Sequence, residues 1–134
     1  ILMNFPDYGF TRSFENVELE QLIERVTEAL KKVGFGVLNR IDMHTNLEKS
    51  AGKKVPPYVI LGACSANFAL QAIAAEPWIG LLLPCNVLVR EVADGKLVVS
   101  LANPAKLFTA VNNPSMEPLA KEVGQRLQAV LERI

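Results

Sequence analysis

The chain has 134 residues, half of them hydrophobic, which is enough for one domain to bury a core without disulfide bonds or structural metals. Its 14 basic residues balance its 14 acidic residues, and the lack of a basic excess argues against nucleic-acid binding. We expect a single domain over residues 3–134, with Ile1 and Leu2 as a cloning remnant and no secretory leader at the N-terminus.

The first part of the chain predicts a strand followed by a long amphipathic helix. Tyr8–Phe14 has the aromatic and β-branched content of a strand. Asn16 is a candidate N-cap, and apolar residues then recur at the spacing of one buried helix face as far as Val33. Gly34 is a candidate left-handed C-cap, so we expect the helix to end there.

The middle of the chain alternates strands with shorter helices. We expect strands over Phe35–Ile41 and Tyr58–Cys64, from their apolar and β-branched content. We expect short helices over Asn46–Ala51 and Ala66–Ala75, which end before a glycine and a proline respectively. The order so far is strand, helix, strand, short helix, strand and helix.

The last part of the chain predicts a hairpin and a C-terminal helix. Leu82–Val92 and Lys96–Leu101 flank Asp94-Gly95, which is a favoured two-residue hairpin turn. A final helix opens near Asn113 and keeps a periodic apolar face to Ile134. The element order predicts an α+β domain.

A two-residue turn pairs Ala93 with Lys96 and thereby decides which hairpin side chains share a face. One face then holds Leu88, Arg90, Val92, Leu97, Val99 and Leu101. The opposite face holds Cys85, Val87, Val89, Glu91, Val98, Ser100 and Ala102. Because neither face is clearly polar, we expect one to pack on the long helices and the other to be covered by a partner subunit, another segment or a ligand.

The uncharged segment from Val55 to Ala75 is long enough to raise the question of a membrane span. Pro56, Pro57 and Gly62 divide it into strand, turn and helix. We therefore expect no membrane-spanning helix and no association with a membrane.

Four stretches of the chain resemble one bacterial and archaeal family. They are GAC at residues 62–64, EPWIGLLLPCNVLVRE at 76–91, the Asp94-Gly95 turn and LANPAKLF at 101–108. The family is the one called domain of unknown function 302, whose members often read Asn-Pro where this chain has Ser65-Ala66. The resemblance implies a curved antiparallel sheet with helices packed on it, similar to a TATA-binding-protein-like unit, and a homodimer. It implies no biochemical activity.

The two cysteines suggest a metal or thiol site. Cys64 and Cys85 lie at predicted strand ends beside turns, 21 residues apart and without a CxxC redox motif. With His44 and Asp42 they would offer thiolate, imidazole and carboxylate ligands that suit zinc. A redox dithiol is a second hypothesis, and a cysteine nucleophile would need His44, the sole histidine, as its base. Buried, inert thiols in a reducing cytoplasm are the structural alternative.

Several polar or aromatic residues are candidates for a small-molecule site, namely Asp42, Asn67, Asn86, Arg90 and Trp78. Each also has a structural explanation, since Asp42 and Asn67 can cap helices and Trp78 can pack in a proline-flanked turn. The scattered glycines make no phosphate-binding loop, so the sequence identifies no cofactor.

Three classes of function remain open from the sequence. The first is a cytoplasmic, dimeric, non-catalytic binding module that holds a small apolar or amphipathic ligand between the sheet and its helices. The second is a metal or thiol-redox site built on Cys64 and Cys85. The third is a structural or protein-interaction domain. No residue is assigned a catalytic role, and whether the protein is an enzyme stays open.

Overall fold

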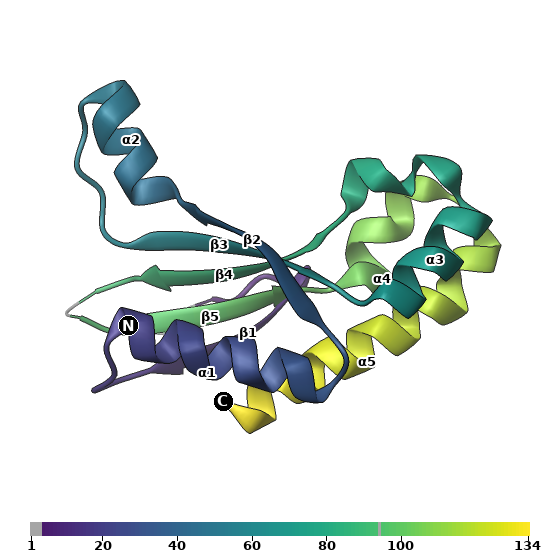
Figure 1. Cartoon of the computed structure of the whole chain (residues 1–134), viewed down its shortest axis with the longest axis horizontal. Coiled ribbons are helices and arrows are strands. Elements are labelled where there is room, and N and C mark those ends of the chain that lie inside the picture. The colour runs from purple at the N-terminus through teal and green to yellow at the C-terminus, as the bar shows by residue number, and fades with distance from the viewer. Residues whose placement is uncertain (1–3, 94) are drawn as a thin grey trace.

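An antiparallel sheet forms the centre of the molecule (Figure 1). The computed structural model describes residues 4–93 and 95–134. Within these residues the sheet has five strands in the order β1-β5-β4-β3-β2, and every neighbouring pair is antiparallel. The strands are β1 Gly9–Phe14, β2 Gly36–Asp42, β3 Tyr58–Cys64, β4 Cys85–Glu91 and β5 Leu97–Ala102.

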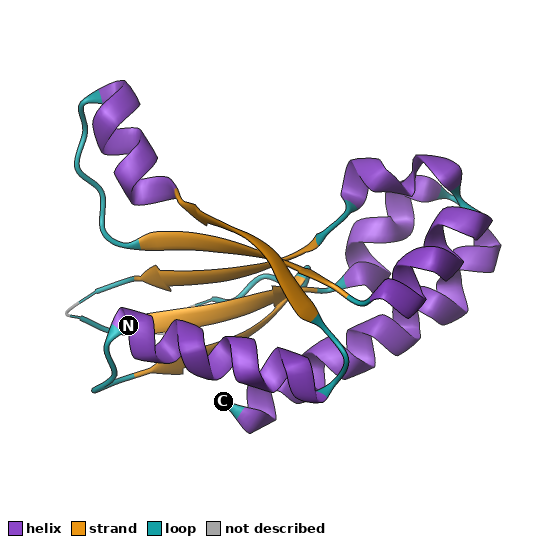
Figure 2. Cartoon of the chain, in the orientation of Figure 1, coloured by secondary structure: helices purple, strands orange, loops and turns teal. Residues whose placement is uncertain are grey.

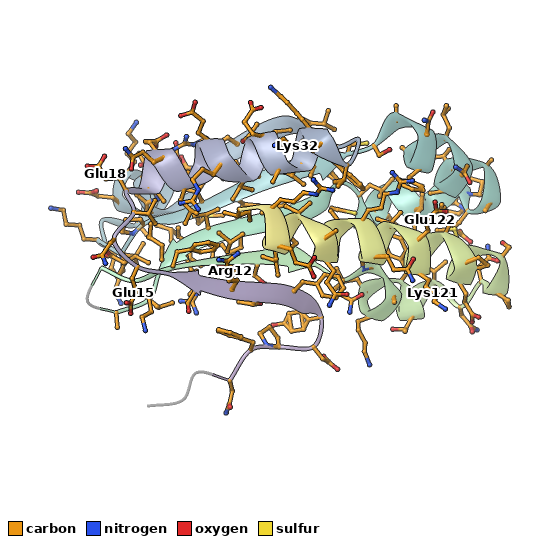
Figure 3. The ribbon with its side chains drawn as sticks, turned by 90° about the horizontal axis from the view of Figure 1, so that it is seen from below. Arg12, Glu15, Glu18, Lys32, Lys121 and Glu122 are labelled. Atoms are coloured by element: carbon orange, nitrogen blue, oxygen red, sulfur yellow. The ribbon has the colours of Figure 1, made fainter. Side chains whose placement is uncertain are left out.

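Two long helices, α1 (Leu19–Lys32) and α5 (Glu117–Arg133), lie side by side over one face of the sheet (Figure 3). Each presents one apolar stripe to the strands, because its apolar residues recur every three or four positions. The buried residues of the two stripes are Leu22, Ile23, Val26, Ala29 and Leu30 in α1, and Ala120, Val123, Gly124, Leu127 and Val130 in α5. They meet the inward side chains of the strands in one hydrophobic core.

The shorter helices gather at the two ends of the sheet (Figure 2). Helix α2 (Met43–Ala51) lies at one end, in the connection between β2 and β3. The other end carries α3 Ala66–Ala75, η1 Pro77–Leu82, α4 Pro104–Leu107, η2 Phe108–Val111 and η3 Pro114–Met116. This group has a small core of its own around Ala72, Ile79 and Met116. The sheet face opposite α1 and α5 is left open, and its central residues Leu88 and Ser100 are half-buried.

The structure confirms the α+β class and the predicted order of elements, and corrects several boundaries. Helix α1 begins at Leu19 after Glu18, whereas Asn16 adopts a left-handed conformation with φ of 56° and does not cap it. Helix α2 begins at Met43 instead of Asn46. Residues 82–84 precede β4, because Leu82 ends the helix η1.

The predicted register of the hairpin is wrong by one residue. The Val92 amide donates to the Lys96 carbonyl at 2.9 Å, so Val92 faces Lys96 and Arg90 pairs with Val98. Asp94 of the predicted turn lies outside the described residues. When one strand slips by one residue, all of its side chains change faces relative to the side chains of its partner strand. The pairs that face the helices are therefore Val87 with Leu101, Val89 with Val99 and Glu91 with Leu97, and the open face is mixed.

The uncharged segment from Val55 to Ala75 is divided between β3 and α3, as the sequence predicts. Among the described residues, every helix is too short or too polar to cross a membrane.

Gly62 of β3 sits where the sheet has no room for a side chain. A Cβ at this position would overlap Asn39 Oδ1 and approach Pro84 Cγ to 2.8 Å. We therefore expect Gly62→Ala to lower the free energy of unfolding by roughly 1–3 kcal/mol.

Gly36→Ala on the neighbouring strand is the matched control, because a Cβ there meets nothing within 4 Å. It should leave stability unchanged or raise it slightly, since alanine has less freedom to lose on folding. Denaturant unfolding of both variants measures the difference, and a Gly62→Ala midpoint equal to that of the wild type would contradict the crowding described here.

Candidate functional site

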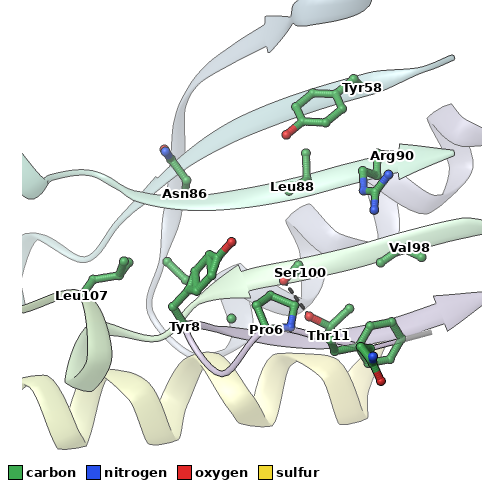
Figure 4. A pocket seen from close by; sticks show the side chains of 14 residues that line it. Pro6, Tyr8, Thr11, Tyr58, Asn86, Leu88, Arg90, Val98, Ser100 and Leu107 are labelled. Carbon is green, nitrogen blue, oxygen red and sulfur yellow. Dashed lines mark hydrogen bonds between the residues drawn. The ribbon is translucent and has the colours of Figure 1, made fainter. Parts of the chain in front are cut away.

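A groove of about 900 Å³ lies on the open face of the sheet (Figure 4). It runs across β1, β5, β4 and the start of β3. Its lining consists of Asn4, Phe5, Pro6, Tyr8, Gly9, Thr11, Tyr58, Asn86, Leu88, Arg90, Val98, Ser100, Ala102 and Leu107. Its volume lies at the upper end of the range found for small-molecule sites, which is about 300–1,000 Å³.

The floor of the groove is low because small residues face one another across β1 and β5. Gly9 pairs with Ala102, and Thr11 pairs with Ser100. The hydroxyl groups of Thr11 and Ser100 are 2.7 Å apart and hydrogen-bond to each other. A Cβ on Gly9 would come within 2.6 Å of Ser100 Oγ, so a larger residue here would displace that hydroxyl group.

The walls of the groove are aromatic. Tyr8 rises beside β1, and Tyr58 rises from β3 on the opposite side, so that the two rings flank Leu88 (Figure 4). The segment that carries Tyr8 is fixed by Asn103, whose amide donates to the Tyr8 carbonyl at 2.9 Å. The Asn103 side chain also donates to the Asp7 carbonyl at 3.2 Å. The Tyr8 wall is thus tied to the end of β5.

Arg90 is the one charged residue that lines the groove. It is half-buried, lies between Tyr58 and Val98 in the sheet register, and makes no ion pair with any residue in the described ranges. The other polar lining groups are hydroxyls and amides. The groove therefore combines an apolar floor, several neutral hydrogen-bonding groups and one positive charge.

The structure brings two of the predicted ligand-binding residues, Asn86 and Arg90, into this groove. Asp42 lies elsewhere, at the start of α2, and accepts a 3.0 Å hydrogen bond from Arg40. Asn67 is exposed in the first turn of α3, and Trp78 is 77% exposed in η1. These last three residues do not share a site with the first two.

Sequence reasoning missed the groove residues Tyr8, Thr11, Ser100 and Leu107. Thr11 and Ser100 are 89 positions apart and meet only because the first and last strands pair. A correct hairpin register would have placed Ser100 beside Leu88 on one face.

The predicted cluster of Cys64, Cys85, His44 and Asp42 is not assembled. Asp42 pairs with Val59 and His44 Nδ1 accepts from the Tyr58 amide at 3.0 Å, so both lie at the beginning of β3. Cys64 ends that strand six residues later, about 20 Å away at 3.3 Å per residue. In the described residues no three His, Cys, Asp or Glu side chains are grouped so that they could hold a metal ion.

The two cysteines themselves lie near each other as free thiols, but on different faces of the sheet. Cys85 pairs with Ala63 and belongs to the core under the helices. Cys64 follows Ala63 along β3 and so takes the opposite face. Burial, and to a smaller extent the nearby Cys64, raises the pKa of Cys85 to about 11. A raised pKa keeps this thiol protonated and unreactive at neutral pH.

The buried Cys85 thiol makes stability depend on alkaline pH. Because its pKa rises from 9.0 to about 11 on folding, the unfolded chain loses this proton first as the pH increases. The contribution of the protonated Cys85 thiol to the free energy of unfolding is complete below pH 9. By pH 11 this contribution has fallen by roughly 2 kcal/mol. Cys85→Ala lacks this contribution, so its free energy of unfolding should fall less over the same interval. Urea titrations at several pH values give the free energy of unfolding of the wild type and of Cys85→Ala as a function of pH. If the two free energies fall equally with pH, Cys85 is not the group responsible.

Comparison with known proteins identifies the family. The chain is similar to an uncharacterized conserved DUF302 protein from Bacillus stearothermophilus, whose crystal structure matches it with a TM-score of 0.88 and 27% sequence identity. That match covers 96% of this chain and 98% of the other. No curated protein matches the chain in sequence. The family model for the domain of unknown function DUF302 matches residues 10–134, so the chain belongs to the DUF302 family.

Proposed function

We propose that the protein is a non-catalytic binding module that holds a small amphipathic ligand in the groove on the open face of its sheet. The observation that carries the proposal is the groove itself, in which the rings of Tyr8 and Tyr58 flank the apolar side chain of Leu88 (Figure 4). The space between the sheet and its long helices, where the sequence led us to expect a ligand, is filled by the hydrophobic core.

The composition of the lining favours binding over chemistry. Its hydroxyl groups would need an adjacent general base to act as nucleophiles, and the lining residues include no His, Asp, Glu or Lys that could serve as one and no Cys. Tyr8, Thr11, Ser100 and Asn86 instead offer neutral donors and acceptors around an apolar surface. Few polar groups on a mainly apolar lining are typical of small-molecule sites.

Native mass spectrometry of freshly purified protein tests this proposal. We expect a fraction of the folded protein to carry extra mass that is lost on denaturation. We expect a Leu88→Arg variant to lose this extra mass, because its longer side chain would fill the space above the apolar groove floor. The control Leu38→Arg changes a leucine that is 68% exposed and does not line the groove. If Leu88→Arg retains the extra mass, the ligand does not occupy the groove, and the proposed site is wrong.

We further propose that two copies associate through α3 and η1. Trp78 and Leu81 are 77% and 84% exposed and are three residues apart in a 3₁₀ helix, so they lie on the same side. Leu70 and Ile73 in α3 are also exposed. Residues 66–82 contain one charged residue, Glu76, which accepts a hydrogen bond from Asn113. An uncharged apolar surface suits a second copy of itself better than a charged partner.

Multi-angle light scattering tests the dimer. We expect twice the 14.7 kDa chain mass for the wild type and the monomer mass for Trp78→Asp, because a charge would be buried without a partner. Leu38→Asp, on the exposed side of β2, is the control and should remain dimeric. A monomeric wild type would overturn the dimer and leave this surface for an unrelated protein partner.

A further inference from the structure

We infer that the ligand of the groove is an amphipathic monoanion, an apolar chain that ends in a carboxylate, and that the carboxylate pairs with Arg90. This inference rests on the proposed function and names the class of ligand. It starts from the charge pattern of the groove, in which Arg90 is the one ionisable cation and no lining residue is acidic.

The position of Arg90 favours a bound anion. The side chain lies between Tyr58 and Val98 and is half-buried, so a ligand that covers it removes water from the guanidinium group. A neutral ligand would leave that charge without a partner, and a cationic ligand would add repulsion. A carboxylate can accept two parallel hydrogen bonds from a guanidinium group. The electrostatics of the groove therefore select an anionic head group.

The apolar part of the ligand has a defined direction. From Arg90 the floor runs along β4 past Leu88 to Asn86, and Leu107 lines the groove at that end (Figure 4). Four residues of strand span about 13 Å. Leu107 is 39% exposed, and the small residues Gly9 and Ala102 leave room beside it. An extended medium-chain fatty acid has this length and would place its tail on Leu107.

Isothermal titration calorimetry with decanoate and 1-decanol, each below its aggregation limit, separates the anionic head from the apolar tail. We expect decanoate to bind the wild type about tenfold more tightly than decanol, which is the gain typical of a charge-assisted hydrogen bond. In Arg90→Gln the preference for decanoate over decanol should fall below about threefold. Arg90→Lys should keep part of this preference, because the positive charge remains. Lys121→Gln, which removes the same charge from α5 on the opposite side of the sheet, should keep all of it.

Each outcome decides a different point. Equal binding of decanoate and decanol would overturn the anionic ligand but leave the groove as a binding site. A decanoate preference that persists in Arg90→Gln would overturn the role of Arg90. If neither compound binds at concentrations up to its solubility limit, both this inference and the proposed function fail for ligands of this size. Circular dichroism of Arg90→Gln and Arg90→Lys checks that the variants are folded.

Discussion

A Leu127→Ala variant is expected to lose about 2–5 kcal/mol of unfolding free energy. Leu127 is completely buried in the middle of α5, within the core that joins this helix to α1 and the sheet. Truncating its side chain removes apolar atoms whose burial stabilises the folded state. It also leaves a cavity that neighbouring side chains cannot fill. The loss is a large part of the 5–15 kcal/mol that usually stabilises a domain.

Leu38→Ala removes the same atoms from β2, where the leucine is 68% exposed, and is the matched control. Its effect should stay within about 0.5 kcal/mol, as for most surface substitutions. Urea denaturation followed by circular dichroism gives both values. A Leu127→Ala variant as stable as Leu38→Ala would mean that α5 does not pack on the sheet as described.

An Ala102→Phe variant is expected to weaken ligand binding at least tenfold without unfolding the protein. Ala102 faces Gly9 on the groove floor, so a phenyl ring there would fill the space between Tyr8 and Leu107. Because the groove is open to solvent above the floor, the added ring need not disturb the core. Tenfold corresponds to about 1.4 kcal/mol of binding free energy, a modest cost for removing the surface on which an apolar tail lies.

Ala51→Phe provides the control for this prediction, because Ala51 is exposed at the end of α2 and does not line the groove. Calorimetry with decanoate compares the two variants with the wild type. Unchanged affinity in Ala102→Phe would show that bound ligand does not use this part of the floor.

The sequence predicts the elements of this fold well where a single local pattern decides them. The periodic apolar residues of α1 place Leu22, Val26 and Leu30 in the core, and all three are completely buried. The run of apolar residues in β3 has the predicted bounds, Tyr58–Cys64. In both cases local propensity and tertiary packing favour the same structure.

The hairpin register could not be decided in the same way. Gly95 has a φ of 75°, and a left-handed glycine occurs both in two-residue turns and in three-residue loops with a bulge. The flanking residues are apolar on both faces, so their pattern does not distinguish the two registers. The hydrogen bond between Val92 and Lys96 and the pairing of Arg90 with Val98 show which register the chain adopts.

The candidate site was predictable only in part. Asn86 and Arg90 stand out as polar residues in an apolar strand, and both line the groove. Tyr8 and Ser100 are far apart in the sequence, and no local signal shows that β1 pairs with β5. Leu107 belongs to α4, which Asn103 caps through a 3.2 Å hydrogen bond from the Ala105 amide. An N-cap asparagine followed by Pro104 is a recognisable helix start that could have revealed this element.

We propose the open face of the sheet, rather than the helical end of the molecule, as the ligand-binding site. An NMR titration of the isotope-labelled protein with decanoate tests this most directly, because each backbone amide reports separately. The largest saturable shifts are expected at Thr11, Leu88 and Ser100, which meet in the centre of the groove floor. Shifts that instead concentrate around Leu70 and Trp78, with the groove amides unchanged, would contradict the proposed site.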